Sequence, residues 1–69
     1  MKAYVFILVK PGSKAEVKEA IPGEVHELYG EYDLIAELNV KDLEELREII
    51  TRIRKNINVL KTETLIAMR

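Results

Sequence analysis

The chain has 69 residues and a net charge of −1, with 48% hydrophobic and 33% charged residues and no cysteine. This length predicts a single domain over residues 1–69, and the composition is typical of a soluble globular protein, not a disordered one. The balanced charge gives no electrostatic basis for binding a phosphate backbone, and the absence of cysteine excludes disulfides, thiol nucleophiles and cysteine-based zinc sites.

The first predicted strand covers residues 2–9 and ends at Lys10-Pro11-Gly12. Its side chains are apolar on both faces, with Ala3, Val5, Ile7 and Val9 on one and Tyr4, Phe6 and Leu8 on the other. A strand of this kind needs cover on both faces. The run is too short to cross a bilayer and no signal-peptide cleavage pattern follows it, so we expect a cytoplasmic protein without membrane contacts.

A short helix should follow the first strand. Ser13-Lys14-Ala15-Glu16 has the form of a capping box, in which the serine hydroxyl and the glutamate carboxylate satisfy free backbone N–H groups. Pro22-Gly23 ends this helix.

The next two strands, residues 25–29 and 32–40, are expected to form a hairpin. Gly30-Glu31 between them fits a two-residue type II′ turn, which prefers glycine first. Alternation divides the third strand between two faces, with Tyr32, Leu34, Ala36, Leu38 and Val40 on one and Asp33, Ile35, Glu37 and Asn39 on the other.

The second helix is predicted to begin at Asp42, where Asp42 to Glu45 forms a second capping box, and Asn56 and Asn58 mark its end. Apolar residues recur at helical spacing at Leu43, Leu46, Ile49, Ile50, Ile53 and Ile57. Its basic residues alternate with acidic ones, with Glu48 and Arg52 spaced to pair, which indicates a solvated face and not a nucleic-acid patch. Residues 59–68 form the last strand, on which the hydroxyls of Thr62 and Thr64 point the same way.

This order of elements predicts an α+β, ferredoxin-like βαββαβ fold. Its four-stranded antiparallel sheet would carry both helices on one face and leave the other face bare in a monomer. Because the first strand is apolar on both faces, we infer that a second subunit covers the bare face, which gives a sheet-to-sheet homodimer, or dimeric α+β barrel.

No constellation of residues predicts catalysis, a metal site or a cofactor. The only histidine, His26, has no second histidine, cysteine or serine nucleophile near it, so it is interpreted as a surface or interface residue. Two interpretations of Asp33 are open. In the first, its side chain bonds local backbone in a solvated turn. In the second, it faces the ammonium of a ligand, while the backbone N–H groups at Gly30 face the carboxylate of the same ligand. Threonine is an ordinary strand residue, so Thr62 and Thr64 are candidate ligand-binding residues only in combination with that turn.

Six ordered segments resemble the C-terminal ligand-binding domain of the Lrp/AsnC transcriptional regulators, also called the RAM domain. They are Ala3-Tyr4-Val5, Lys10-Pro11-Gly12, Ile21-Pro22-Gly23, Gly30-Glu31-Tyr32-Asp33-Leu34-Ile35, Asp42-Leu43-Glu44-Glu45-Leu46 and Thr62-Glu63-Thr64. The resemblance covers nearly the whole chain. It is to the stand-alone form, because no helix-turn-helix domain precedes the first strand, so no direct contact with nucleic acid is expected.

The resemblance implies a homodimer that assembles further, as a tetramer up to an octamer, with an amino-acid effector bound between dimers. Carried over by motif, the ligand-binding residues are Gly30, Glu31, Tyr32, Asp33, Thr62 and Thr64. A full-length Lrp/AsnC regulator is the implied protein partner, and the implied function is amino-acid sensing that modulates transcription through shared assembly.

Two features depart from the family pattern. The segment from Ser13 to Tyr29 is shorter, and Tyr29 stands where the family usually has a small hydroxyl residue, so it could narrow or fill the pocket. A ligand-free scaffolding oligomer is therefore a second hypothesis. A small dimeric-barrel enzyme is a third, although its only acid-base candidates, His26, Tyr32 and Asp33, lack a convincing spacing.

Overall fold

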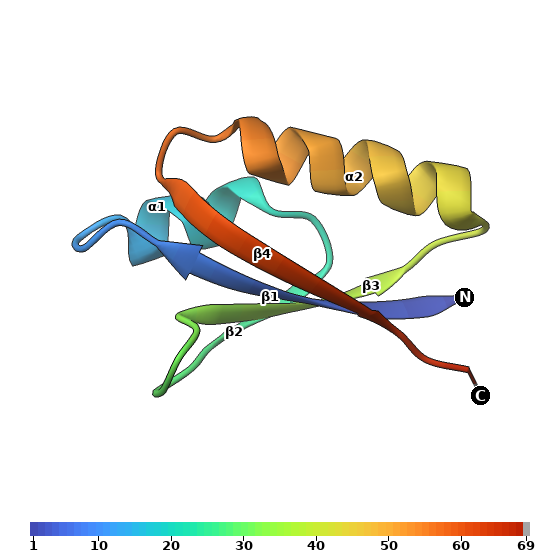
Figure 1. Ribbon diagram of the computed structural model, residues 1–69, viewed down its shortest axis with the longest axis horizontal. Helices are drawn as coiled ribbons and strands as arrows, with labels where there is room; N and C mark the ends of the chain where they lie inside the picture. Colours follow the sequence, from blue (N-terminus) through green and yellow to red (C-terminus); the bar gives the residue numbers. More distant parts are fainter. Residues whose placement is uncertain (69) are drawn as a thin grey trace.

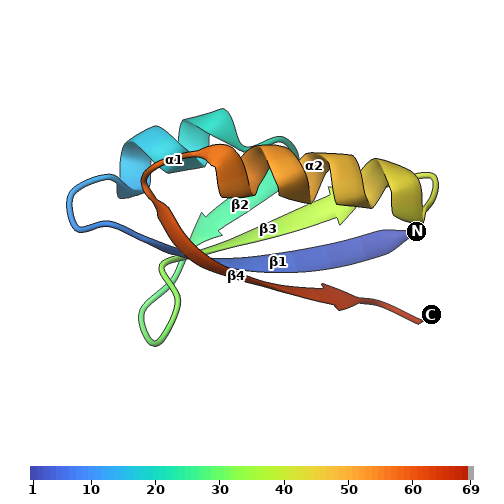
Figure 2. The same cartoon turned by 45° about the horizontal axis from the view of Figure 1, so that its top comes forward.

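The computed structural model describes residues 1–68, which form a four-stranded antiparallel sheet with two helices on one face (Figures 1 and 2). The elements in chain order are β1 (Lys2–Val9), α1 (Lys14–Ala20), β2 (Glu24–Glu27), β3 (Leu34–Asn39), α2 (Leu43–Lys55) and β4 (Val59–Ile66). The strands lie in the order β2-β3-β1-β4 across the sheet. The predicted ferredoxin-like βαββαβ fold is therefore confirmed.

The core lies between the sheet and the two helices, and β1 supplies its centre. Alternate β1 side chains at Ala3, Val5 and Ile7 are completely buried on the helix side of the sheet. The rest of the buried core comes from the end of β1, from β3 and the residue after it, and from the two helices and the residue after α1: Val9, Leu34, Ala36, Leu38, Val40, Val17, Ile21, Leu46 and Ile53. Full burial of a side chain such as Ile7 contributes roughly 1.5–3 kcal/mol to folding.

The opposite face of the sheet has no covering layer among the described residues (Figure 2). The other β1 side chains, Tyr4, Phe6 and Leu8, lie on this open face and are only half-buried. Their cross-strand neighbours include Ile35, opposite Phe6 on β3, and Leu65, opposite Tyr4 on β4. The apolar open face predicted for a single subunit is therefore present.

The two helices start differently, and of the two predicted capping boxes one forms in part and the other does not form. The Asp42 carboxylate accepts a 2.9 Å hydrogen bond from the Glu45 backbone N–H, as expected, although Glu45 reaches back to the N–H of Lys41 and not to that of Asp42. The Ser13 hydroxyl instead donates to the Lys10 carbonyl at 2.6 Å and makes no cap. The prediction of a capping box for α1 was wrong, because the Ser13 hydroxyl bonds the turn before the helix and not the helix itself.

Fewer of the apolar residues at helical spacing in and after α2 are buried than the sequence pattern indicated. Leu46 and Ile53 are buried, whereas Leu43 at the start is 56% exposed and Ile57, beyond the helix end, is 80% exposed. The expected pair of Glu48 and Arg52 is not among the ion pairs of the described residues. Within residues 1–68, no helix is long and apolar enough to cross a membrane.

The connection between β2 and β3 is wider than the predicted two-residue turn. The strands pair only from Glu27 opposite Leu34, and one further hydrogen bond of 2.8 Å joins the Leu28 N–H to the Asp33 carbonyl. Residues 29–32 therefore form a four-residue loop. Gly30 has a φ of +135°, far from the roughly +60° that the first central residue of a type II′ turn requires.

Strand β4 pairs with β1 and carries one irregularity. Leu8 pairs with Lys61 and Val9 with Val59, so Leu60 is an extra residue between two paired positions, a β-bulge. On the regular side of the bulge, Thr62 lies opposite Ile7 and Thr64 opposite Val5.

Gly23 connects α1 to β2 at a point where the backbone passes very close to β3. Its φ is +88°, and a Cβ atom there would lie 2.6 Å from the Glu37 carbonyl oxygen and 2.8 Å from Leu38 Cδ2. Gly12 has a similar φ of +85° with no atom within 4 Å of the same position. A Cβ atom would bring left-handed backbone strain at both positions, but a steric clash only at Gly23. Comparing the two positions therefore separates the cost of the strain from the cost of the clash.

We predict that Gly23→Ala destabilises the fold by about 2–5 kcal/mol, because it adds a backbone clash to left-handed strain. Gly12→Ala is the matched control and should cost only the strain, about 1–2 kcal/mol. Urea unfolding midpoints at fixed protein concentration measure both. Equal losses for the two variants would contradict the close approach at Gly23.

Candidate functional site

Asp33 fastens the loop between β2 and β3 to the end of β1. Its carboxylate Oδ2 accepts a hydrogen bond of 2.9 Å from the Val9 backbone N–H, and its own N–H donates to the Ile7 carbonyl at 3.0 Å. The backbone that Asp33 bonds is therefore distant in the sequence, not the local turn. The other carboxylate oxygen, Oδ1, has no hydrogen-bond partner among residues 1–68, so Asp33 retains an acceptor for a ligand.

Tyr32 lies on the open face of the sheet and not on the core face where strand alternation placed it. Its ring contacts Phe6 with centroids 5.6 Å apart, and its hydroxyl donates to Glu63 Oε1 at 3.0 Å. The prediction was wrong because β3 begins only at Leu34, so Tyr32 belongs to the loop. Tyr32 ties that loop to β4 across β1.

The surroundings of Tyr32 keep its phenol protonated. Partial burial raises the pKa of Tyr32 above its ordinary value, and the hydrogen bond and negative charge of Glu63 raise this pKa further. Lys61, whose ammonium lies 5.7 Å from the ring centroid, acts in the opposite direction. Tyr32 is therefore a hydrogen-bond donor at neutral pH.

The tip of the loop points into solvent. Gly30 and Glu31 are exposed, and open space surrounds the Cα atom of Gly30, so its backbone is accessible to another molecule. The Tyr29 side chain is also fully exposed. Tyr29 therefore fills no cavity of its own subunit, and its role as a pocket-filling residue stays a prediction about a neighbouring chain.

Thr62 and Thr64 share one face of β4, as predicted, but it is the helix side of the sheet. They pair with the buried residues Ile7 and Val5, and both are half-buried. Tyr32 lies on the opposite face with Glu63. Within one subunit the structure therefore does not bring the threonine pair together with Tyr32.

A shallow hollow beside Asp33 was not predicted from the sequence. It lies where the Lys10-Pro11-Gly12 turn approaches the bulge at Leu60, and Lys14 from the start of α1 also lines it. Two lysines and Asp33, whose carboxylate keeps one free oxygen, thus line the same space. No local pattern could have revealed it, because the residues come from three separate segments of the chain.

His26 lies on the short edge strand β2, where its Nε2 is 3.9 Å from the Glu24 carboxylate and both side chains are largely exposed. This placement agrees with its interpretation as a surface or interface residue. Among residues 1–68, no group of three or more histidine, cysteine, aspartate or glutamate side chains is arranged to hold a metal ion.

Comparisons with known proteins agree on one family. The family model described as the Lrp/AsnC ligand binding domain matches residues 2–69. The crystal structure of FFRP-DM1 superimposes with a TM-score of 0.89 at 36% identity, covering 97% of this chain and 97% of that one.

Two further solved structures are similarly close. The protein TTHA0845 from Thermus thermophilus gives a TM-score of 0.90 at 35% identity over 99% of this chain and 92% of that one. A hypothetical protein, PHS023 from Pyrococcus horikoshii, gives 0.88 at 35% identity over 99% and 89%. All three are chains of nearly the same length as this one. No curated protein matches this chain.

The bond from Val9 to Asp33 generates a stability prediction. Asp33→Ala leaves the part-buried Val9 N–H without a partner, so it should destabilise the protein by about 1–3 kcal/mol. Asp33→Asn keeps a side-chain oxygen at the same place and should lose less. Urea unfolding of both variants measures the difference. Equal losses for the two would show that the carboxylate oxygen does not hold the loop.

Proposed function

The chain belongs to the Lrp/AsnC ligand-binding domain family, and from that membership we propose that it acts as an amino-acid-sensing effector module. The family match over residues 2–69 carries the proposal. The domain of this family is a regulatory ligand-binding module. We propose that this chain acts in the cytoplasm by joining the assembly of a full-length Lrp/AsnC-type regulator.

The proposed ligand is a free amino acid, whose two opposite charges fit the groups around the loop. Asp33 Oδ1 would accept from the ammonium, and the exposed backbone of Gly30 would donate to the carboxylate, with Glu31 at the rim. Lys10 and Lys14 add positive charge beside Asp33. An ion pair with each end of the zwitterion would select amino acids over simple amines or acids.

The site is proposed to form between subunits. Tyr32 and the threonine pair lie on opposite faces of one sheet, so the loop of one chain and the Thr62 and Thr64 hydroxyls of another would have to combine. A ligand that binds only the assembled form stabilises it by mass action. Amino-acid concentration would then bias the oligomeric state, from a dimer towards a tetramer or octamer.

The dimer itself is proposed to form through the open face of the sheet. Tyr4, Phe6, Leu8, Ile35 and Leu65 give this face an apolar centre. Charged groups lie around it, including the ion pair of Lys2 with Glu37 at 3.5 Å. An apolar centre with a polar rim is typical of a protein–protein interface.

A ligand-free scaffolding oligomer remains the second candidate function, and the exposure of Tyr29 at the loop tip favours it. A tyrosine that is fully exposed in its own subunit can occupy a cavity of a neighbouring one. Catalysis is not part of the proposal, because Tyr32 bonds Glu63 and Asp33 bonds Val9, so neither is paired with His26 as an acid-base couple.

The dimer proposal predicts the effect of a charge on the open face. Phe6→Glu should raise the dimer dissociation constant about 100-fold or more, because it places an unpaired carboxylate in the apolar interface. Thr51→Glu adds the same charge on the exposed side of α2 and is the control. Light scattering at micromolar concentration should give a dimer or larger species for the wild type and Thr51→Glu, and a monomer for Phe6→Glu. A monomeric wild type would refute this dimer.

Ligand binding is tested by thermal denaturation with each proteinogenic amino acid in turn. A selective ligand should raise the Tm, by about 4–8 °C for each kcal/mol of stabilisation in a domain of this size. Thr64→Val should reduce the shift and Thr51→Val should preserve it. These variants are preferred to Asp33→Ala, which also loosens the loop. A stable oligomer with no shift for any amino acid would favour the scaffolding function.

A further inference from the structure

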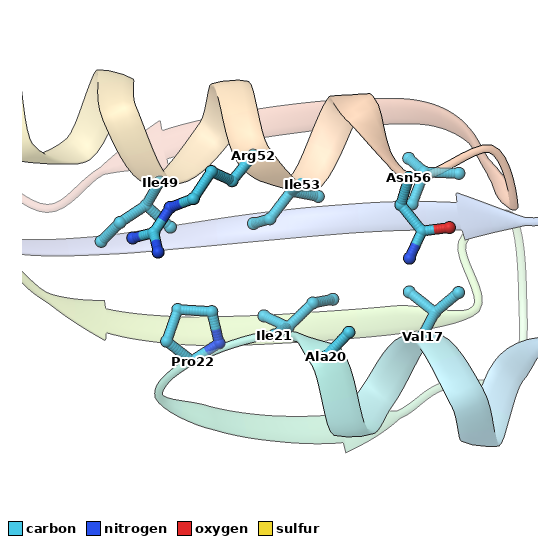
Figure 3. Close-up of a pocket in the computed structure, with 9 residues that line it drawn as sticks. Val17, Ala20, Ile21, Pro22, Ile49, Arg52, Ile53 and Asn56 are labelled. Carbon is cyan, nitrogen blue, oxygen red and sulfur yellow. The ribbon is translucent and has the colours of Figure 1, made fainter.

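A narrow cleft separates the two helices on the covered side of the sheet (Figure 3). Its walls are apolar and come from α1, from α2 and from the segment after α1: Val17, Ala20, Ile21, Pro22, Ile49 and Ile53. The cavity has a volume of about 80 Å³. All of its lining residues belong to one subunit, so it is distinct from the proposed site between subunits.

The cleft stays open because α1 is short and its facing residue is small. α1 has seven residues against thirteen in α2, and Pro22-Gly23 turns the chain away after it. Ala20, in the last turn of α1, presents only a methyl group to the space below α2. A larger side chain at this position would close the gap.

Two polar side chains from α2 and its C-terminal end border this apolar space. The Arg52 side chain extends along the cleft next to Ile49. No acidic group among residues 1–68 lies within 4 Å of the Arg52 guanidinium, although Glu48 is one turn away on the same helix. Arg52 therefore offers an unpaired positive charge at the rim.

Asn56 contributes a donor with a fixed orientation. Its Oδ1 accepts a hydrogen bond of 2.9 Å from the Asn58 backbone N–H, which leaves the amide nitrogen facing away from that bond. Figure 3 shows this nitrogen directed across the cleft towards Val17. The cleft thus presents two hydrogen-bond donors above an apolar floor, and none of its lining residues is acidic.

We propose that this cleft binds a short aliphatic carboxylate. Its volume of about 80 Å³ is far below the roughly 300–1,000 Å³ of a pocket for a drug-sized ligand, so it suits only a small alkyl group. The carboxylate would pair with the Arg52 guanidinium, a geometry that permits two parallel hydrogen bonds. An amino acid fits less well, because its ammonium would have no acidic partner there.

The test titrates the isotope-labelled protein with isovalerate (3-methylbutanoate) and follows methyl and backbone NMR signals. Shifts should be largest for Val17, Ile49 and Ile53. Acetate has the charge without the branched chain, and 3-methylbutan-1-ol has the chain without the charge. Each should bind at least about tenfold more weakly than isovalerate, since each loses one of the two interactions.

Variants assign the contacts. Arg52→Gln should weaken isovalerate binding at least about tenfold, whereas Arg54→Gln, on the same helix but outside the cleft, should leave it unchanged. Ala20→Leu should fill the space and abolish binding while the fold is retained. Both Arg52 and Ala20 are exposed, so these variants should fold.

The proposal is overturned if isovalerate causes no shifts at tens of millimolar, or if binding survives both Arg52→Gln and Ala20→Leu. Shifts confined to the loop around Asp33 and to Thr64 would also overturn it, because the carboxylate would then occupy the proposed effector site. Failure of amino acids to bind the oligomer would leave this result unaffected, since the cleft is complete in one subunit.

Discussion

The structure depends on a central strand that is apolar on both faces, only one of which is covered by a layer within residues 1–68. β1 lies between β3 and β4, so it is a central strand and not an edge strand. Both helices pack on the side of Val5 and Ile7, and no layer of residues 1–68 covers the side of Phe6, where the Tyr32 ring is its contact from the loop. Burial on the helix side stabilises the subunit, while the exposed apolar area on the other side favours association.

The same strand also organises the loop at the candidate site. Asp33 bonds the backbone of β1 at Ile7 and Val9, and Tyr32 reaches across Phe6 to Glu63 on β4. The loop is therefore held at its base by contacts with two other strands, while its tip at Gly30 remains in solvent. A rigid base with an accessible tip positions backbone groups for a ligand without burying them.

Element order and the inner face of the sheet follow directly from hydrophobic periodicity, because residues such as Val5, Ile7 and Leu34 repeat with the period of a strand. Of the details that were predicted wrongly, the turn at Gly30 depends on a contact far away in the sequence, and the cap at Ser13 is lost to a competing local one. The turn at Gly30 widens because Asp33 bonds β1, twenty-four residues earlier at Val9. Ser13 has the pattern of a cap, but the carbonyl of Lys10 competes for its hydroxyl.

The bulge at Leu60 has a consequence for how the sheet can grow. β4 is an edge strand of eight residues, and a long regular edge is a template onto which another chain can add a strand. The extra residue breaks the regular spacing of the free N–H and C=O groups along this edge. Strand addition along β4 is thereby discouraged, which favours closed assemblies over open-ended fibres.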